Sequence, residues 1–419
     1  MLAAMHDTAP PSSTDLPPVE KHSAWQVFWV FLQLGLTSFG GPVAHLGYFR
    51  TALVERRRWF GDAQYADLVA LCQFLPGPAS SQVGMALGLM RAGWWGCLAA
   101  WLGFTLPSAL ALIALAVGLQ HWPHLADAAW VHGLKLVAVA VVAHAVLGMW
   151  RQLCKGWLRK LLALGSAATL LVWPGATWQV LLMVASALIG WQFLTVAPAA
   201  DPAASGQKLP LSRKTGWALI VCFAVLLVLI LPNLAWWWPS VATQAIAAFY
   251  EAGALVFGGG HVVLPLLQAS VVPPGWISDA QFLTGYAAAQ AVPGPLFTLA
   301  AYLGALLPLP APWAGWAGGL LMLVVIFLPA FLLVAGALPW WQQLRQHAGA
   351  QRALAGVNAA VVGVLLAAFV NPVWTSAIHR ASDVLIALAA LALLQWRRTP
   401  PVLVVLLTAL AAWLVALIA

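Results

Sequence analysis

Two Pro-Gly-Pro sequences carry the residues of this chain that are best suited to bind an anion. The first is followed by two serines and a glutamine: Pro76-Gly77-Pro78, Ser80, Ser81 and Gln82. A helix that starts after this turn leaves its first N–H groups without intrahelical acceptors, and its dipole places partial positive charge there. The side chains add neutral donors. The pattern predicts an oxyanion site at the start of a half-helix, with a kink that only serves helix packing as the alternative.

A second copy of this motif lies in the other half of the chain. It comprises Gln290, Pro293-Gly294-Pro295 and Thr298, with fewer hydroxyl groups than the first copy. Two half-helix ends that arrive from opposite directions can hold one oxyanion through backbone N–H groups. We therefore expect the two Pro-Gly-Pro turns to act together.

Two Phe-Gly-Gly sequences also interrupt apolar stretches, and each has a histidine nearby. The glycines and histidines concerned are Gly40, Gly41, His45, Gly258, Gly259 and His261. Non-helical backbone at membrane depth is tolerated only where it lines a cavity or is buried in protein. We include these residues in the candidate substrate site, with local packing as the alternative for the histidines.

Lys135 is the one basic residue expected inside an apolar span, and Asn358 occupies the corresponding place in the second half. A lysine at membrane depth is costly unless it is paired or hydrated, so it usually faces a cavity. We interpret Lys135 as a counter-charge for an anion or as part of a proton-linked site. The alternative is a lysine that extends its amine to the membrane surface.

Motifs of enzymatic chemistry are absent from the sequence. No Walker-type nucleotide loop, HExxH motif or other zinc spacing occurs. We predict no enzyme activity, no catalytic residues, no metal site and no cofactor. Without a nucleotide site, transport is expected to be driven by an ion gradient or to be passive.

The composition determines which elements must position these residues. The 419 residues are 63% hydrophobic and only 7% charged, whereas soluble proteins carry roughly 25% charged residues. This excludes a soluble enzyme and a secreted disulfide scaffold, and it predicts an all-α polytopic membrane protein embedded in the lipid bilayer. The net charge of +8 is interpreted as a topology signal and not as a nucleic-acid signature.

The chain is an internal duplication. The Trp-Phe-Gly-Asp-Ala-Gln-Tyr sequence at 59–65 returns as Trp-Ile-Ser-Asp-Ala-Gln-Phe at 276–282, and the Pro-Gly-Pro turns show the same offset of 217 residues. Asp62 and Asp279 start these repeated helices and are interpreted as N-caps. We predict a polar cytoplasmic segment at 1–24, a first repeat at 25–196, a linker with an inverting helix at 197–242 and a second repeat at 243–419.

Charge placement predicts that the two repeats are inverted. The segment 50–62 holds four arginines, whereas its counterpart at 264–280 holds no Lys or Arg. If the four broken segments are re-entrant hairpins and the N-terminus is cytoplasmic, 17 of the 19 basic residues lie inside, as the positive-inside rule favours. This arrangement has nine full spans and a periplasmic C-terminus. Inverted repeats with broken helices are typical of secondary transporters.

At these motifs the sequence resembles the chromate ion transporter family in its long two-domain form, over roughly residues 25–418. The resemblance rests on Phe39-Gly40-Gly41-Pro42, Pro76-Gly77-Pro78 with Ser80-Ser81-Gln82, Phe257-Gly258-Gly259-Gly260-His261, Gln290 through Pro295, and Gly356-Val357-Asn358. It implies export of chromate across the inner membrane of a bacterium, driven by the membrane potential or a proton gradient, and hence chromate resistance. Gln82 stands where the family pattern favours an acidic residue, which puts a proton role at that position in doubt.

Two other functions remain open from the sequence. A sulfate or other oxyanion permease fits the same motifs, because sulfate is a tetrahedral dianion of similar size. A passive anion channel fits them as well. The pattern is also compatible with a homodimer, and it predicts no nucleic-acid partner.

Overall fold

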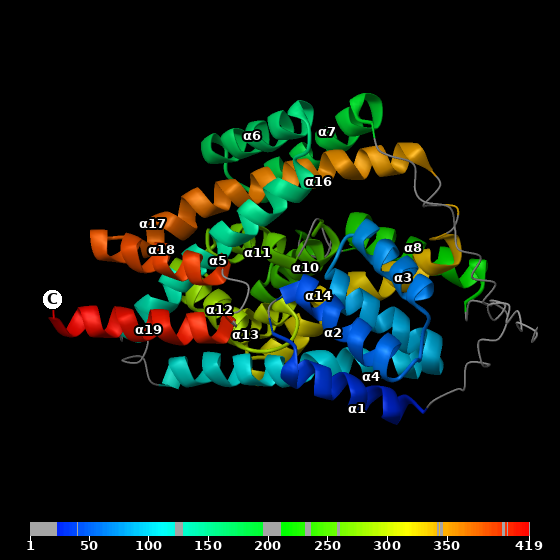
Figure 1. Cartoon of the computed structure of the whole chain (residues 1–419), viewed down its shortest axis with the longest axis horizontal. Helices are drawn as coiled ribbons and strands as arrows, with labels where there is room; N and C mark the ends of the chain where they lie inside the picture. Colours follow the sequence, from blue (N-terminus) through cyan, green and yellow to red (C-terminus); the bar gives the residue numbers. More distant parts are fainter. Residues whose placement is uncertain are drawn as a thin grey trace, which may run out of the picture.

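The computed structural model describes residues 23–39, 41–121, 129–195, 211–230, 236–257, 260–341, 343, 347–395, 399 and 401–418. Every regular element within these residues is a helix, and Figure 1 shows most of the helices running along the long axis of the molecule. The predicted all-α fold is therefore confirmed.

The helices of the first half include two interrupted pairs followed by three continuous helices. They are α1 (Ala24–Thr37), α2 (Gly41–Phe49) with the π-helical η1 (Arg50–Arg56), α3 (Asp62–Phe74), α4 (Ala79–His121), α5 (Ala129–Leu153), α6 (Trp157–Val172) and α7 (Ala176–Phe193). One further helix, α8 (Arg213–Val225) with its extension η3 (Leu226–Ile230), lies between the two halves in the sequence.

The second half repeats this order. Its first elements are α10 (Val241–Ala254), η4 (Gly260–Val262), α11 (Val263–Val271), α12 (Asp279–Ala291), η5 (Leu296–Thr298) and α13 (Leu299–Leu306). They are followed by α14 (Trp316–Ala337) with η6 (Leu338–Trp340), α16 (Ala348–Ala368) with η7 (Phe369–Trp374), α17 (Thr375–Ala377), α18 (Ala381–Gln395) and α19 (Pro401–Ile418).

All four predicted interruptions occur. The chain leaves the helical conformation between α1 and α2, between α3 and α4, between α10 and η4, and between α12 and η5. Gly77 and Gly294 have backbone φ angles of +123° and +109°, which side chains other than glycine rarely adopt. Gly40, Gly258 and Gly259 lie outside the described residues.

The long helix α4 consists of two arms that fold against each other. Ala92 and Gly93 leave the helical conformation, with φ +63° at Gly93. Gly88 and Gly96, one on each arm, lie so close that a side chain on either would meet the backbone of the other. The chain therefore reverses direction at Ala92 and Gly93, and the arm 79–91 lies against the longer arm that follows, as expected for a re-entrant segment.

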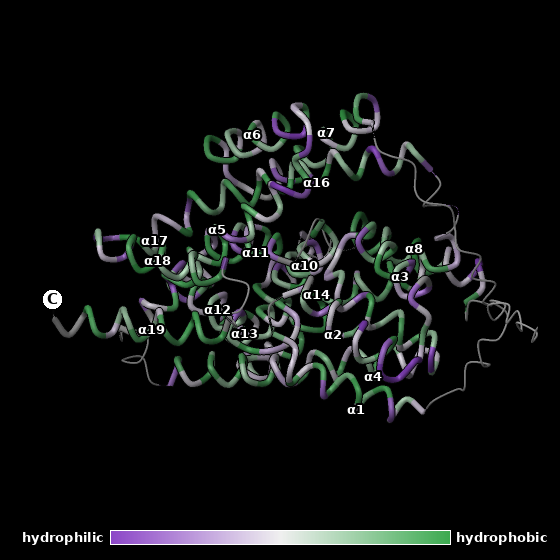
Figure 2. Tube along the Cα trace, in the orientation of Figure 1, coloured by the Kyte–Doolittle hydropathy of each residue, from purple (hydrophilic) through white to green (hydrophobic). Residues whose placement is uncertain are grey.

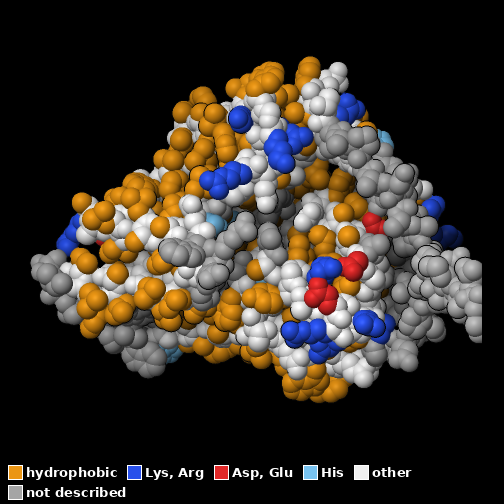
Figure 3. Space-filling model, viewed as in Figure 1, with side chains coloured by type: hydrophobic (Ala, Val, Ile, Leu, Met, Phe, Trp, Pro, Cys, Tyr) orange, Lys and Arg blue, Asp and Glu red, His pale blue; other side chains and the backbone are white. Residues whose placement is uncertain are grey.

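Among the described residues, four helices are long and apolar enough to cross a membrane: Ala79–His121, His132–Leu153, Trp316–Trp340 and Ala348–Ala377. The stretches predicted as spans near 158–174 and 382–395 form helices of 16 and 15 residues, shorter than the roughly 20 residues that cross a bilayer core. Figure 2 shows that apolar residues dominate most of the helices, and Figure 3 shows a largely apolar surface, as lipid contact requires.

The two halves are interlocked by an exchange of helices. In the first half α5 packs against α18 and α19, and in the second half its counterpart α16 packs against α6 and α7. Figure 1 shows α6 and α7 above α16. Each half therefore completes its core with the helical hairpin of the other.

The hairpins that contain the Pro-Gly-Pro turns lie towards opposite ends of the molecule: Figure 1 shows α3 towards the right and α12 towards the left. We therefore predict that reporter fusions within 50–60 and within 268–278 report opposite sides of the membrane. The first site is expected on the cytoplasmic side because of its arginines. A fusion pair that reports the same side for both sites would contradict the inverted arrangement.

Candidate functional site

The two Pro-Gly-Pro turns are joined to the two Phe-Gly-Gly breaks across the repeat interface. The Gly77 N–H donates a hydrogen bond of 2.7 Å to the carbonyl of Val256, and the Gly294 N–H donates one of 3.0 Å to the carbonyl of Ser38. Val256 and Ser38 each stand immediately before a Phe-Gly-Gly sequence. Each turn of one repeat is thus tied to the break of the other repeat, and all four interruptions meet in one region.

A second pair of contacts follows the same symmetry. A side chain added at Gly77 would lie 3.6 Å from the Cβ of Ala330, and one added at Gly294 would lie 2.7 Å from the hydroxyl of Ser108. Ser108 and Ala330 both follow a repeated Leu-Pro pair. Each turn therefore packs on the long helix of the opposite repeat, α4 or α14.

The first turn is surrounded by buried polar side chains. His45 Nδ1 lies 3.3 Å from the Ser80 hydroxyl, and Gln82 Nε2 donates a 2.8 Å hydrogen bond to the Pro76 carbonyl. The ring of His45 packs edge-on against Phe104, with 5.2 Å between ring centroids. His45, Ser80 and Gln82 are all at most 2% exposed. The structure thus brings these three residues of the predicted substrate site together.

Several buried polar atoms of the first repeat, at or next to its two interruptions and its Leu-Pro pair, have no hydrogen-bond partner among the described residues. They are Ser38 Oγ, His45 Nε2, Ser81 Oγ, Gln82 Oε1 and Thr105 Oγ1. We call Ser38, His45, Ser80, Ser81, Gln82 and Thr105 the polar break cluster. Buried polar groups in proteins nearly always have partners. Together with the N–H groups at the start of α4, the polar break cluster can therefore accommodate a polar ligand.

The second turn is built differently. The Thr298 hydroxyl donates a 2.8 Å hydrogen bond to the Pro295 carbonyl, so this hydroxyl is satisfied within its own turn. His261 Nδ1 lies 2.9 Å from the Tyr286 hydroxyl. The second turn thus offers fewer open hydroxyls than the first, but Gln290 Nε2 beside it is buried without a hydrogen-bond partner among the described residues.

Lys135 and Asn358 lie in helices that pack against elements of the second repeat. Lys135 is half-buried in α5, which packs along α12. Asn358 lies in α16, which contacts η4, and its Oδ1 is buried without a hydrogen-bond partner. Their helices therefore approach the side of the site that carries His261.

Asp62 and Asp279 are not the N-caps that the sequence predicted. Gly61 and Ser278 occupy the N-cap positions of α3 and α12, and each aspartate is the first residue of its helix. In α12 the Ser278 hydroxyl accepts the backbone N–H of Gln281 at 3.2 Å. This cap leaves the aspartate carboxylate available for contacts outside the helix.

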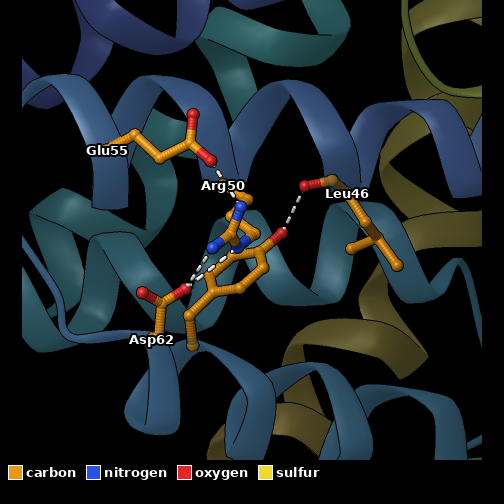
Figure 4. A network of polar contacts seen from close by, with 5 residues as sticks. Leu46, Arg50, Glu55 and Asp62 are labelled. Atoms are coloured by element: carbon orange, nitrogen blue, oxygen red, sulfur yellow. Dashed lines mark hydrogen bonds and ion pairs between the residues drawn. The ribbon is translucent and has the colours of Figure 1, made fainter.

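At Asp62 this contact is an ion-pair network on the surface (Figure 4). Arg50 Nε and Nη2 donate to Asp62 Oδ1 at 2.9 and 2.7 Å, and Arg50 also pairs with Glu55. The hydrogen bonds to Asp62 and the charges of both carboxylates raise the pKa of Arg50 above its ordinary value. The network joins the end of α2 and η1 to the start of α3.

Four residues of the site were not found from the sequence: Ser38, Thr105, Ser108 and Tyr286. Ser38 and Ser108 adjoin repeated motifs, Phe-Gly-Gly and Leu-Pro, so their place beside the duplicated residues was the available signal. Thr105 also adjoins the repeated Leu-Pro pair, whereas Tyr286 carries no sequence signal that separates it from other residues of apolar helices.

Comparisons with known proteins identify the family of this chain. A family model described as chromate transporter matches residues 25–191 and 243–413. The chromate transport protein of Pseudomonas aeruginosa is 30% identical over 414 residues, which cover 93% of this chain and 92% of that protein. A probable chromate transport protein of Synechococcus elongatus is 28% identical over 400 residues, 93% of this chain and 95% of the relative. The chromate transport protein of Cupriavidus metallidurans is 26% identical over 390 residues, 87% of each chain.

No solved structure matches this chain significantly. The family model covers most of the chain in two segments, one in each half. The chain therefore belongs to the chromate transporter family.

Proposed function

We propose that this protein is a secondary active transporter that exports chromate from the cytoplasm across the inner membrane and thereby confers chromate resistance. The observation that carries the proposal is the reciprocal pair of hydrogen bonds, Gly77 to Val256 and Gly294 to Ser38. These bonds bring the interrupted helices of both repeats to their shared interface, which is where transporters built from inverted repeats bind their substrates. The names of the relatives supply chromate as the substrate.

The polar break cluster suits a tetrahedral oxyanion. The start of the α4 half-helix offers backbone N–H groups and the positive end of a helix dipole. The hydroxyls of Ser81, in the first turn of α4, and Thr105 have no partner among the described residues and can donate to substrate oxygens. Neutral donors bind an anion without a fixed positive charge, whose attraction would oppose release of the substrate.

Unequal packing of the two repeats supports alternating access. In the second repeat α12 packs along α5 and α19. The corresponding pairs of the first repeat, α3 with α16 and α3 with α7, do not pack in this way among the described residues, and Figure 3 shows this face of the molecule hollowed at its centre. If the two repeats exchange these arrangements, the site opens to the opposite side of the membrane.

The decisive experiment is chromate flux with purified protein in liposomes. We expect chromate movement against its gradient when a membrane potential or a proton gradient is imposed, and loss of that movement when an uncoupler is added. Empty liposomes and liposomes with the Gly294→Ala variant are the controls. The absence of any gradient-driven chromate movement would overturn the proposal.

The same assay separates two alternative functions. A sulfate permease would transport sulfate in preference to chromate, and competition by sulfate against labelled chromate in both vesicle orientations measures this. A passive channel would give a flux that is independent of the coupling gradient and far above carrier turnover.

The proposed orientation places the N-terminus in the cytoplasm and the C-terminus in the periplasm.

Replacing Lys135 with alanine is expected to lower chromate transport about tenfold, since a lysine near the substrate path supplies charge that attracts a dianion. Lys135→Arg is expected to keep part of the activity because it keeps the charge. Chromate accumulation in cells is the measurement, and the amount of protein in the membrane fraction is the folding control. Full activity of the alanine variant would remove Lys135 from the mechanism.

A further inference from the structure

The contact between Arg50 and Asp62 has a counterpart in the second repeat that lacks its positive charge. Gln268 Nε2 donates a 2.8 Å hydrogen bond to Asp279 Oδ1. The aspartates are 217 residues apart, and Arg50 and Gln268 are 218 residues apart, which are the offsets of the repeat. Both contacts join the helix after a Phe-Gly-Gly break to the start of the helix before a Pro-Gly-Pro turn.

Because Gln268 stands where the first repeat has Arg50, the net charge at the contact with Asp279 differs from that at Asp62. In the first repeat a guanidinium neutralises the aspartate at 2.7 Å. In the second repeat the partner is a neutral amide, so Asp279 keeps its formal negative charge. An ionised carboxylate that is partly withdrawn from water requires compensation by an opposite charge.

Asp279 faces a cavity of about 220 Å³ that lies between the two repeats. Its polar lining consists of Gln179 at the start of α7, Gln268 in α11, Asp279 in α12 and Asn371 in η7. The other lining residues are apolar, and no Lys, Arg or His is among them. The cavity therefore combines one negative charge with several amide oxygens.

Gln179 supplies an independent sign of a ligand. Its residue is only 6% exposed, and its Oε1 has no hydrogen-bond partner among the described residues. An acceptor oxygen that is buried in this way costs free energy unless a donor or a cation satisfies it. The carboxylate and this oxygen line the same cavity, so one cation can satisfy both.

We propose that this cavity binds an alkali-metal cation such as Na⁺. Asp279 provides the charge, and the side-chain oxygens of Gln179, Gln268 and Asn371 provide neutral ligands of the hard type that such ions prefer. The cavity has room for an ion and several of its waters, since one water occupies roughly 30 Å³. The negative charge of Asp279 repels oxyanions from this cavity, so the cavity is a site separate from the polar break cluster. The proposal does not depend on chromate as the substrate.

The test measures binding of radioactive Na⁺ to the purified full-length protein in detergent. Wild-type protein is expected to bind Na⁺ saturably, and Na⁺ in place of choline at constant chloride is expected to raise the thermal midpoint by a few degrees. Competition by unlabelled K⁺ then measures the selectivity of the site for Na⁺ over K⁺.

Three variants make the test specific. Asp279→Asn is expected to lower the affinity for Na⁺ at least tenfold because the negative charge is removed. Gln268→Arg recreates the ion pair of the first repeat and is expected to lose binding while Asp279 is intact. Asp62→Asn removes the equivalent carboxylate at the other contact and is expected to bind Na⁺ like wild type. Absence of saturable binding in the wild type, or wild-type binding in folded Asp279→Asn and Gln268→Arg proteins, would overturn the proposal.

Discussion

Replacing Gly77 or Gly294 with alanine is expected to abolish chromate transport. Both residues have positive φ angles, +123° and +109°, and a side chain in such a conformation costs on the order of 1–3 kcal/mol. The added Cβ would lie 2.8 Å from Gln82 Nε2 at the first turn and 2.7 Å from Ser108 Oγ at the second. Either the turn or the side chain of Gln82 or Ser108 must shift to relieve these contacts, and the strain of the positive φ favours a shift of the turn. The hydrogen bond to the opposite repeat would then be lost, and with it the alignment of the two half-helices.

The measurement is chromate accumulation in cells that express each variant, together with the thermal midpoint of the purified protein. Gly165→Ala in α6 is the matched control, because a side chain there meets nothing within 4 Å. Alanine is also the better helix former, so this control is expected to be at least as stable as wild type and fully active. Normal export by either turn variant would show that the reciprocal hydrogen bonds do not position the site.

The sequence was sufficient to predict the four interruptions, because proline and glycine act locally on the backbone. It also predicted the duplication, since constant offsets such as that between Asp62 and Asp279 need no structural knowledge. The all-helical fold followed from composition alone. The structure confirms that the helices end at the expected motifs, with α3 ending at Phe74 and α12 at Ala291.

The cross-pairing of the repeats was beyond sequence reasoning. Nothing in the sequence around Gly77 indicates that its N–H reaches Val256, 179 positions further along the chain, because such contacts depend on how the two halves dock. The interpretation of Asp62 and Asp279 as N-caps was wrong for a related reason. A serine or glycine one position earlier fits the cap equally well, and the partner that engages each aspartate is distant in sequence.

The difference between the two turns also required the structure. Ser81 and Thr298 stand at similar places after their Pro-Gly-Pro turns, yet the Thr298 hydroxyl bonds back to Pro295 whereas the Ser81 hydroxyl has no partner among the described residues. Both are buried hydroxyls in nearly repeated sequences. The structure shows that the Ser81 hydroxyl is available and the Thr298 hydroxyl is not, whereas Gln290 Nε2 remains an available donor just before the second turn.

Ser81→Asp is accordingly expected to reduce chromate transport to background. A carboxylate at this place would occupy the N–H groups at the start of α4, because anions are stabilised at helix N-termini. It would also repel a dianion from the polar break cluster. Since the helix end itself accommodates the added charge, we expect the variant to remain folded and monodisperse, so that stability and transport respond separately.

Two further variants identify the cause of that loss. Ser81→Ala removes one neutral donor, and a hydrogen bond to a charged group contributes about 1.5–3 kcal/mol. We therefore expect a roughly 10- to 100-fold weaker apparent affinity for chromate in liposome uptake, but not a complete loss. Ser212→Asp places the same carboxylate on the exposed N-cap of α8, where the serine already accepts the Thr215 N–H, and should leave transport unchanged. Wild-type transport by Ser81→Asp would mean that chromate does not bind at the start of α4. The oxyanion site would then have to be sought at the second turn, beside His261 and Tyr286.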